Sequence, residues 1–189
     1  MESRRENRSG QLAVHHLHWP RDEAFFAAGE KILAPRKCIM PAFLYVEDEA
    51  YVMLSVNVIR TRRIDMRYLS VILNSSVVRY WLRHRGNMHG SNFQIDAAPL
   101  QQIPIASATQ KQRDVIASLQ EQCREATPLI EACVIECYFG ARDVSFIDAA
   151  AKHLDDPQSL DTPSSDIVQR LTRLVEHGPD WSALVRGDC

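Results

Sequence analysis

The order of apolar patterns between Lys31 and Ile105 constrains the fold of this chain more than any other feature. Short runs rich in β-branched and aromatic residues, interrupted by Pro35 and Pro41, are typical of strands. These runs are KILAPRKC, AFLYV and AYVMLSVNVIR. Within residues 65–86, apolar side chains recur every three or four positions, which predicts a helix. We therefore predict an α+β fold, in which a small mixed β-sheet packs with helices and a helical C-terminal region follows.

Turn and cap residues mark the boundaries of these elements. Asp65 is a plausible N-cap for the helix, and Gly86 is expected to end it. The acidic residues 47–49 are expected to form a hairpin tip. Residues 86–96 are expected to form a polar loop, and the next elements are a rigid turn at 99–104 and helices at 109–126 (capped by Thr109), 128–139 and 167–177.

The domain boundaries follow from this order of elements. We expect an N-terminal arm over residues 1–19, a mixed domain over 20–106 and a helical region over 107–189. No apolar run approaches the roughly 18–20 residues that a membrane span needs, so no membrane partner is expected.

Charge divides the chain into unlike parts. Residues 31–92 contain ten Lys or Arg against four acids, whereas residues 93–189 contain eight against fifteen, in a chain whose formal net charge is −2. A basic segment in a near-neutral chain suggests a polyanionic partner. Charge complementarity between the two halves is an alternative explanation.

The cysteines and histidines give no strong sign of a metal site. Five cysteines without a CxxC pair fit a reducing cytoplasm better than a disulfide framework. Cys133 and Cys137 lie one helical turn apart, but buried thiols are commonly small apolar packing groups. We expect no metal and no cofactor in this chain.

Several short motifs resemble one family when they are taken in order. They are Lys31-Ile32 with Arg36, the helix from Tyr68-Leu69 to Ile72-Leu73-Asn74-Ser75, and the closing Leu100 with Ile103-Pro104-Ile105. In this order they resemble the TaqI-like C-terminal specificity domain of adenine-N6 DNA methyltransferases and fused restriction–modification enzymes. The later LIEACVIECYFG is similar to a helix of BREX-type phage-defence methyltransferases.

The resemblance implies a target-recognition module that holds duplex DNA against a separate methyltransferase catalytic domain or subunit, in a bacterial or archaeal cytoplasm. The chain has no Pro-Pro pair and no G-x-G pair. It therefore lacks the N/D-P-P-Y/F motif and the glycine-rich turn that would serve methyl transfer. We expect no catalytic residues here, and S-adenosylmethionine is expected only in the catalytic domain of the parent protein.

Two groups of residues are the candidates for DNA contact. Cations at strand ends suit phosphate contacts, which position a protein without specifying sequence. The first group is Arg36, Lys37, Arg60, Arg62 and Arg63. Arg, Asn and Gln side chains suit base edges in the major groove. The second group is Arg83, His84, Arg85, Asn87, His89, Asn92 and Gln94.

A structural role is the alternative for each of these residues. Single arginines are usually part of a solvated face, and residues 86–94 could be an ordinary connection. We expect Asn74 to hydrogen-bond a neighbouring strand or loop, and Trp81 and Phe93 to lie in the core. An assembly module whose basic surface meets an acidic protein partner is the competing function.

Overall fold

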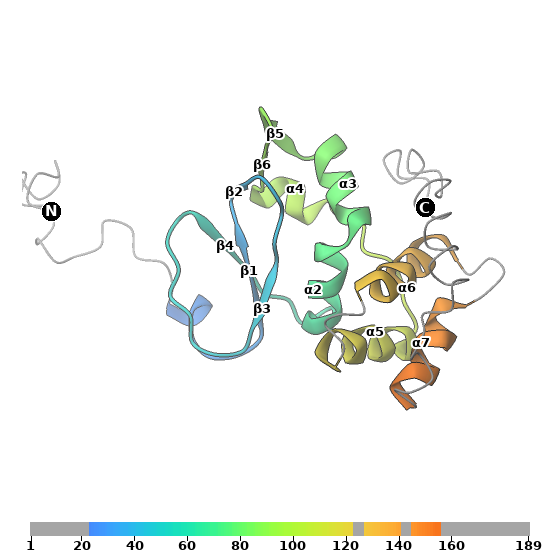
Figure 1. Ribbon diagram of the computed structural model, residues 1–189. Helices are drawn as coiled ribbons and strands as arrows, with labels where there is room; N and C mark the ends of the chain where they lie inside the picture. Colours follow the sequence, from blue (N-terminus) through green and yellow to red (C-terminus); the bar gives the residue numbers. More distant parts are fainter. Residues whose placement is uncertain (1–22, 123–126, 141–144, 156–189) are drawn as a thin grey trace, which may run out of the picture.

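The computed structural model describes residues 23–122, 127–140 and 145–155 (Figure 1). The fold is α+β, as the sequence predicts, with a set of packed helices. The predicted single mixed sheet is wrong, since the described strands form two small sheets in which every pair is antiparallel. The predicted helix at 167–177 and the arm at 1–19 lie outside the described residues.

The first sheet has the strand order β3-β1-β4. Its strands are β1 (Lys31–Pro35), β3 (Leu44–Val46) and β4 (Val56–Ile59). β1 pairs Ile32 with Tyr45 on one side and with Ile59 on the other. The acidic residues 47–49 therefore belong to a connection that crosses from one edge of the sheet to the other, and the predicted hairpin tip is wrong. Pro35, the last residue of β1, is paired with Val56 of β4.

The second sheet has the order β2-β6-β5 and overturns the predicted loop at 86–96. It contains β2 (Lys37–Cys38), β5 (Asn87–His89) and β6 (Asn92–Gln94). β5 and β6 form a tight hairpin whose turn holds Gly90 at φ 64°, a conformation that favours glycine. The predicted loop is a hairpin because Met88 and Phe93, which are paired across β5 and β6, point to the core while their polar neighbours point outward. One apolar residue in each strand is too short a pattern to predict a strand from the sequence.

The predicted helix at 65–86 is two helices. α2 (Met66–Asn74) is capped by Asp65, as predicted, since the Asp65 carboxylate accepts a hydrogen bond from the Tyr68 amide at 2.8 Å. Ser75 then adopts an extended conformation, and its hydroxyl accepts a hydrogen bond from the Val78 amide. Ser75 therefore ends α2 and begins α3 (Ser76–Arg85).

Short and long helices complete the fold. The expected turn at 99–104 overlaps a short helix, α4 (Ala97–Gln101). α5 (Gln110–Gln122) starts as predicted, because Thr109 and Gln112 hydrogen-bond each other's backbone amides in a capping box. α6 (Thr127–Phe139) matches the predicted third helix, and α7 (Phe146–Asp155) was not anticipated. A short 3₁₀ turn, η1 (Glu23–Phe25), precedes the first sheet.

One continuous apolar core joins the sheets to the helices. It extends from Ile32 in β1 through α2 and α3 to Ala150 in α7. α2 contacts both β1 and β3 and also packs on α5, so it is the element shared by the sheet and the helical layer. Within the described residues, no helix combines the length and apolar character that crossing a bilayer requires.

Candidate nucleic-acid interface

The β2-β6-β5 sheet presents one polar face. The register places Gln94 of β6 opposite both Lys37 and Asn87, and Asn92 opposite His89. Paired residues point to the same side of a sheet, and residues two apart in one strand do so as well. The five predicted contact residues of this sheet therefore share one side. We call this side the hairpin face; it consists of Lys37, Asn87, His89, Asn92 and Gln94.

The opposite side of the same sheet is apolar. Phe93 lies opposite Cys38 and Met88, is 5% exposed, and belongs to the core cluster together with them. Because this side is anchored to the core, the hairpin face is turned outward. Lys37, Asn87 and His89 are exposed, while Asn92 and Gln94 are half-buried.

An acidic residue sits beside the hairpin face. The Arg36 guanidinium donates to the Asp96 carboxylate at 3.0 Å, and the Gln94 amide donates to the other carboxylate oxygen at 2.9 Å. Arg36 first, and then Gln94 and Asn87, lower the pKa of Asp96 below its ordinary value of 3.8. Asp96 therefore stays charged at neutral pH and offsets the charge of Arg36, a constraint that the sequence did not reveal.

The basic end of α3 lies directly before this sheet in the chain. Arg83, His84 and Arg85 occupy the last turn of α3, where cations are favoured by the helix dipole, and all three are exposed. The His84 ring contacts the Tyr80 ring, with centroids 4.3 Å apart and the ring planes tilted by 42°. α3 also contacts β5, so these side chains lie next to the hairpin.

The strand-end arginines lie elsewhere. Arg60 follows Ile59, which pairs with Ile32 at the start of β1, whereas Lys37 comes after the end of β1. At about 3.3 Å per residue, roughly 15–20 Å separate these two levels of the sheet. Arg60 is also held to the fold, because its guanidinium donates to the Ala24 carbonyl at 2.5 Å.

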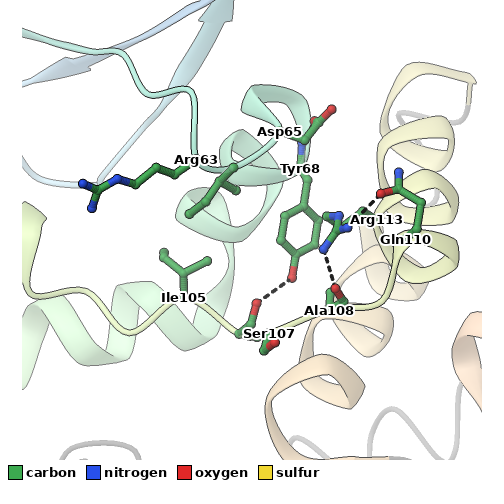
Figure 2. A pocket seen from close by; sticks show the side chains of 10 residues that line it. Arg63, Asp65, Tyr68, Ile105, Ser107, Ala108, Gln110 and Arg113 are labelled. Carbon is green, nitrogen blue, oxygen red and sulfur yellow. Dashed lines mark hydrogen bonds between the residues drawn. The ribbon is translucent and has the colours of Figure 1, made fainter.

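The other two strand-end arginines, Arg62 and Arg63, are exposed. Arg63 lines a cavity beside α2 and α5 (Figure 2). The structure thus divides the twelve predicted residues: nine lie on or beside the small sheet, and Arg60, Arg62 and Arg63 lie at the other end of β1.

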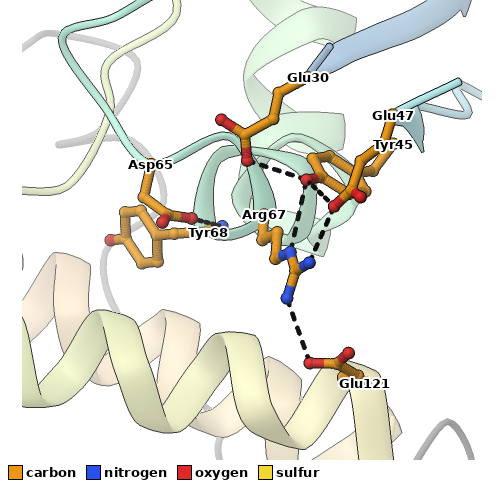
Figure 3. Close-up of polar contacts among 7 residues, drawn as sticks. All are labelled: Glu30, Tyr45, Glu47, Asp65, Arg67, Tyr68 and Glu121. Atoms are coloured by element: carbon orange, nitrogen blue, oxygen red, sulfur yellow. Dashed lines mark hydrogen bonds and ion pairs between the residues drawn. The ribbon is translucent and has the colours of Figure 1, made fainter. Parts of the chain in front are cut away.

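Part of the basic surplus is internal to the fold. Lys31 is fully buried, and its ammonium donates to the carbonyls of Gly29 and Asp48. Arg67 bridges Glu47 at 2.8 Å and Glu121 at 3.3 Å (Figure 3). The second ion pair joins the basic segment to the acidic half of the chain, so charge complementarity between the halves accounts for some of the asymmetry.

The same cluster has a second polar centre at Tyr45. Its hydroxyl lies 2.9 Å from a Glu30 oxygen and 2.6 Å from a Glu47 oxygen (Figure 3). Burial and these carboxylates raise the pKa of Tyr45, while Tyr45 and Arg67 lower the pKa of Glu47. The cluster joins β3 to the start of α2, and its one cation, Arg67, is ion-paired within the fold.

Three residues for which a structural role was predicted have that role. Asn74 forms two hydrogen bonds with the Phe43 backbone, one from its amide to the carbonyl at 2.7 Å and one from the Phe43 amide at 3.0 Å. Trp81 and Phe93 are buried in the core.

Among the described residues, Cys38, Cys133 and Cys137 form no disulfide, and burial raises the pKa of Cys133 and of Cys137. In the part of the chain that the structure describes, no three His, Cys, Asp or Glu side chains gather as metal ligands would. Comparison with protein-family models and with curated protein sequences found no match to this chain.

Proposed function

We propose that this chain is the DNA target-recognition module of an adenine-N6 DNA methyltransferase in a restriction–modification or phage-defence system. In this role it binds duplex DNA for a separate catalytic domain or subunit in the bacterial or archaeal cytoplasm. It does no chemistry of its own, and S-adenosylmethionine binds to the catalytic partner.

The observation that carries this proposal is the hairpin face. The DNA major groove admits a two-stranded β-ribbon, and amide side chains pair with adenine while basic side chains pair with guanine. The β5–β6 hairpin presents Asn87, Asn92 and His89 on one outward side, with Lys37 across the sheet. Arg83 and Arg85, which the sequence placed among the base-edge candidates, lie at the end of α3 beside the ribbon, where they suit phosphate contacts instead.

The proposal is tested by titrating labelled duplex DNA with the whole chain at several salt concentrations. Because about five to seven phosphates would be neutralised, log K should fall with log salt at a slope of about −5 to −6. The double variant Lys37→Gln/Arg83→Gln should make this slope shallower by about 2. Lys111→Gln is the control, since Lys111 is also exposed but is ion-paired with Asp148 in the helical layer.

A base-reading residue should behave differently from a phosphate contact. Asn92→Ala should cost about 1–3 kcal/mol with the preferred DNA sequence and much less with other sequences. No duplex binding at low salt, or an unchanged slope in the double variant, would contradict the proposal. Methyl transfer by the isolated chain would contradict the proposal that catalysis belongs to a separate domain or subunit.

A protein-assembly module is the second candidate, and one observation favours it. Seven large apolar side chains are exposed between η1 and β4, with Met53 at 80% and Ile39 at 76%. Exposed apolar surface of this kind often marks a protein interface. Co-purification with a partner that survives nuclease treatment, together with loss of that partner in Met53→Ser, would favour this function.

A further inference from the structure

The cavity beside α2 has the size of a small-ligand site. Its volume is about 490 Å³, and small-molecule pockets commonly measure about 300–1,000 Å³. It lies among the start of α2, the segment 105–108 and the start of α5 (Figure 2). The hairpin face lies elsewhere in the fold, with β5 and β6 at the top of Figure 1 and α5 at the bottom.

Two arginines line this cavity and leave many donors unused. Arg113 donates to the Ala108 carbonyl and, at 2.8 Å, to the Gln110 side chain, so part of its five-donor guanidinium stays available. The Arg63 side chain makes no ion pair or hydrogen bond with any described residue. Figure 2 shows Arg63 on one side of the Tyr68 ring, with Arg113 and Gln110 on the other.

The segment between α4 and α5 adds backbone donors. Its residues 105–108 line the cavity, and their amide groups donate to no acceptor within the described ranges. Ala108 is buried and its amide needs water or a ligand as a partner, whereas Ile105, Ala106 and Ser107 are half-buried or exposed and their amides are open to water or to a ligand. The Arg113 guanidinium and the amides of this segment that face the cavity favour an anion, and Arg63 stands at the edge with its guanidinium directed away from Tyr68 (Figure 2).

The remaining lining is apolar apart from one acid. Ile64, Ile105 and the Tyr68 ring form walls, and the Tyr68 hydroxyl is occupied by a 3.3 Å hydrogen bond to the Ala106 carbonyl. Asp65 accepts the Tyr68 amide through one carboxylate oxygen. Its second oxygen suits an amino or hydroxyl group on the body of a ligand.

We propose that this cavity binds a small phosphate monoester of about mononucleotide size. A carboxylate offers two oxygens, whereas a phosphate monoester offers three terminal oxygens, which suits it better to a guanidinium group and backbone amides together. The phosphate lies against the amides and Arg113, and the exposed Arg63 side chain turns over it. The apolar walls and Asp65 bind the part of the ligand that carries the phosphate group. This site stands independently of DNA binding by the hairpin face.

The test is calorimetric titration of the whole chain with adenosine monophosphate, inorganic phosphate and adenosine. The monophosphate should bind more tightly than either of the other two. Arg63→Gln should weaken its binding by at least about tenfold, since a hydrogen bond between charged groups is lost. Arg62→Gln is the matched control, because Arg62 is the exposed neighbour and is not part of the lining.

Ser107→Trp provides a second variant, since it fills the cavity without changing a charge, and it should abolish binding. Unfolding of each variant without ligand checks that the fold persists. No binding of the monophosphate at millimolar concentration, or equal binding by wild type and Arg63→Gln, would overturn the proposal. Equal affinity for inorganic phosphate and for adenosine monophosphate would overturn the proposal that the ligand is of about mononucleotide size.

A competition experiment separates a free ligand from a phosphate of DNA. The monophosphate should leave labelled duplex bound to the chain, because the cavity and the hairpin face are separate sites. Displacement of the duplex would overturn the assignment to a free ligand. Lys37→Gln/Arg83→Gln should keep its affinity for the monophosphate, so the two proposals fail separately.

Discussion

The hairpin sheet and the helical layer around α6 use polar side chains in opposite ways. In the helical layer, Glu131 accepts hydrogen bonds from the Ser76 backbone and hydroxyl, and Glu136 accepts from Ser145, Phe146 and Ile147. One helix thus supplies the carboxylates that cap α3 and α7. On the hairpin face, Asn87 and His89 are exposed. Glu131 and Glu136, which stabilise the fold, each accept several hydrogen bonds, whereas Asn87 and His89, which are the candidates for partner contact, are exposed to solvent.

The largest effect that tests this comparison should come from Glu136→Ala. Glu136 is 7% exposed, and its loss leaves the donors at the start of α7 without an acceptor. The free energy of unfolding should fall by about 2–4 kcal/mol, measured by urea denaturation. Glu121→Ala, which removes an exposed ion-paired carboxylate, should change it by less than about 0.5–1 kcal/mol. Equal effects of the two variants would break the comparison.

Asn74→Ala should have the next largest effect. It removes both hydrogen bonds to the Phe43 backbone and separates the end of α2 from the segment leading into β3. We expect a loss of about 2 kcal/mol in the free energy of unfolding by the same measurement. A neutral result would mean that water replaces the side chain at this site.

The double variant Asn87→Ala/His89→Ala should leave stability nearly unchanged. Both side chains are exposed, so the free energy of unfolding should move by about 0.5 kcal/mol or less for each substitution. Duplex affinity should nevertheless fall, which a fluorescence anisotropy titration would measure. Strong destabilisation would show that the hairpin face belongs to the scaffold.

The smallest effect concerns the titration of Asp96. Because Arg36 lowers its pKa below 3.8, the stability from this carboxylate is present above the ordinary pKa and is lost as the pH falls through the lowered value, below about pH 4. Carboxyl-carbon NMR should give a midpoint below 3.8, and Arg36→Gln should raise it. A midpoint that does not respond to Arg36→Gln would contradict the pairing.

Local chemistry made several elements predictable from the sequence. The caps at Asp65 and Thr109 and the start of α6 depend on residues within one helical turn, so the sequence carries them directly. The Asn74 contact was also predictable, because a polar residue within an apolar helical pattern needs a partner. The break at Ser75 was missed, although the Ser-Ser pair after Asn74 is a cap signal.

The sequence by itself determined the α+β class, the positions of most helices and strands, and the residue types available for a polyanion. The tertiary structure alone decided that five of those residues share the hairpin face, that Asp96 offsets Arg36, and that Lys31 is buried. It also decided that Arg67 pairs with Glu121, a partner 54 positions away. Periodicity and capping act within a few residues, whereas sheet register and ion pairing are set by packing between segments far apart in the chain.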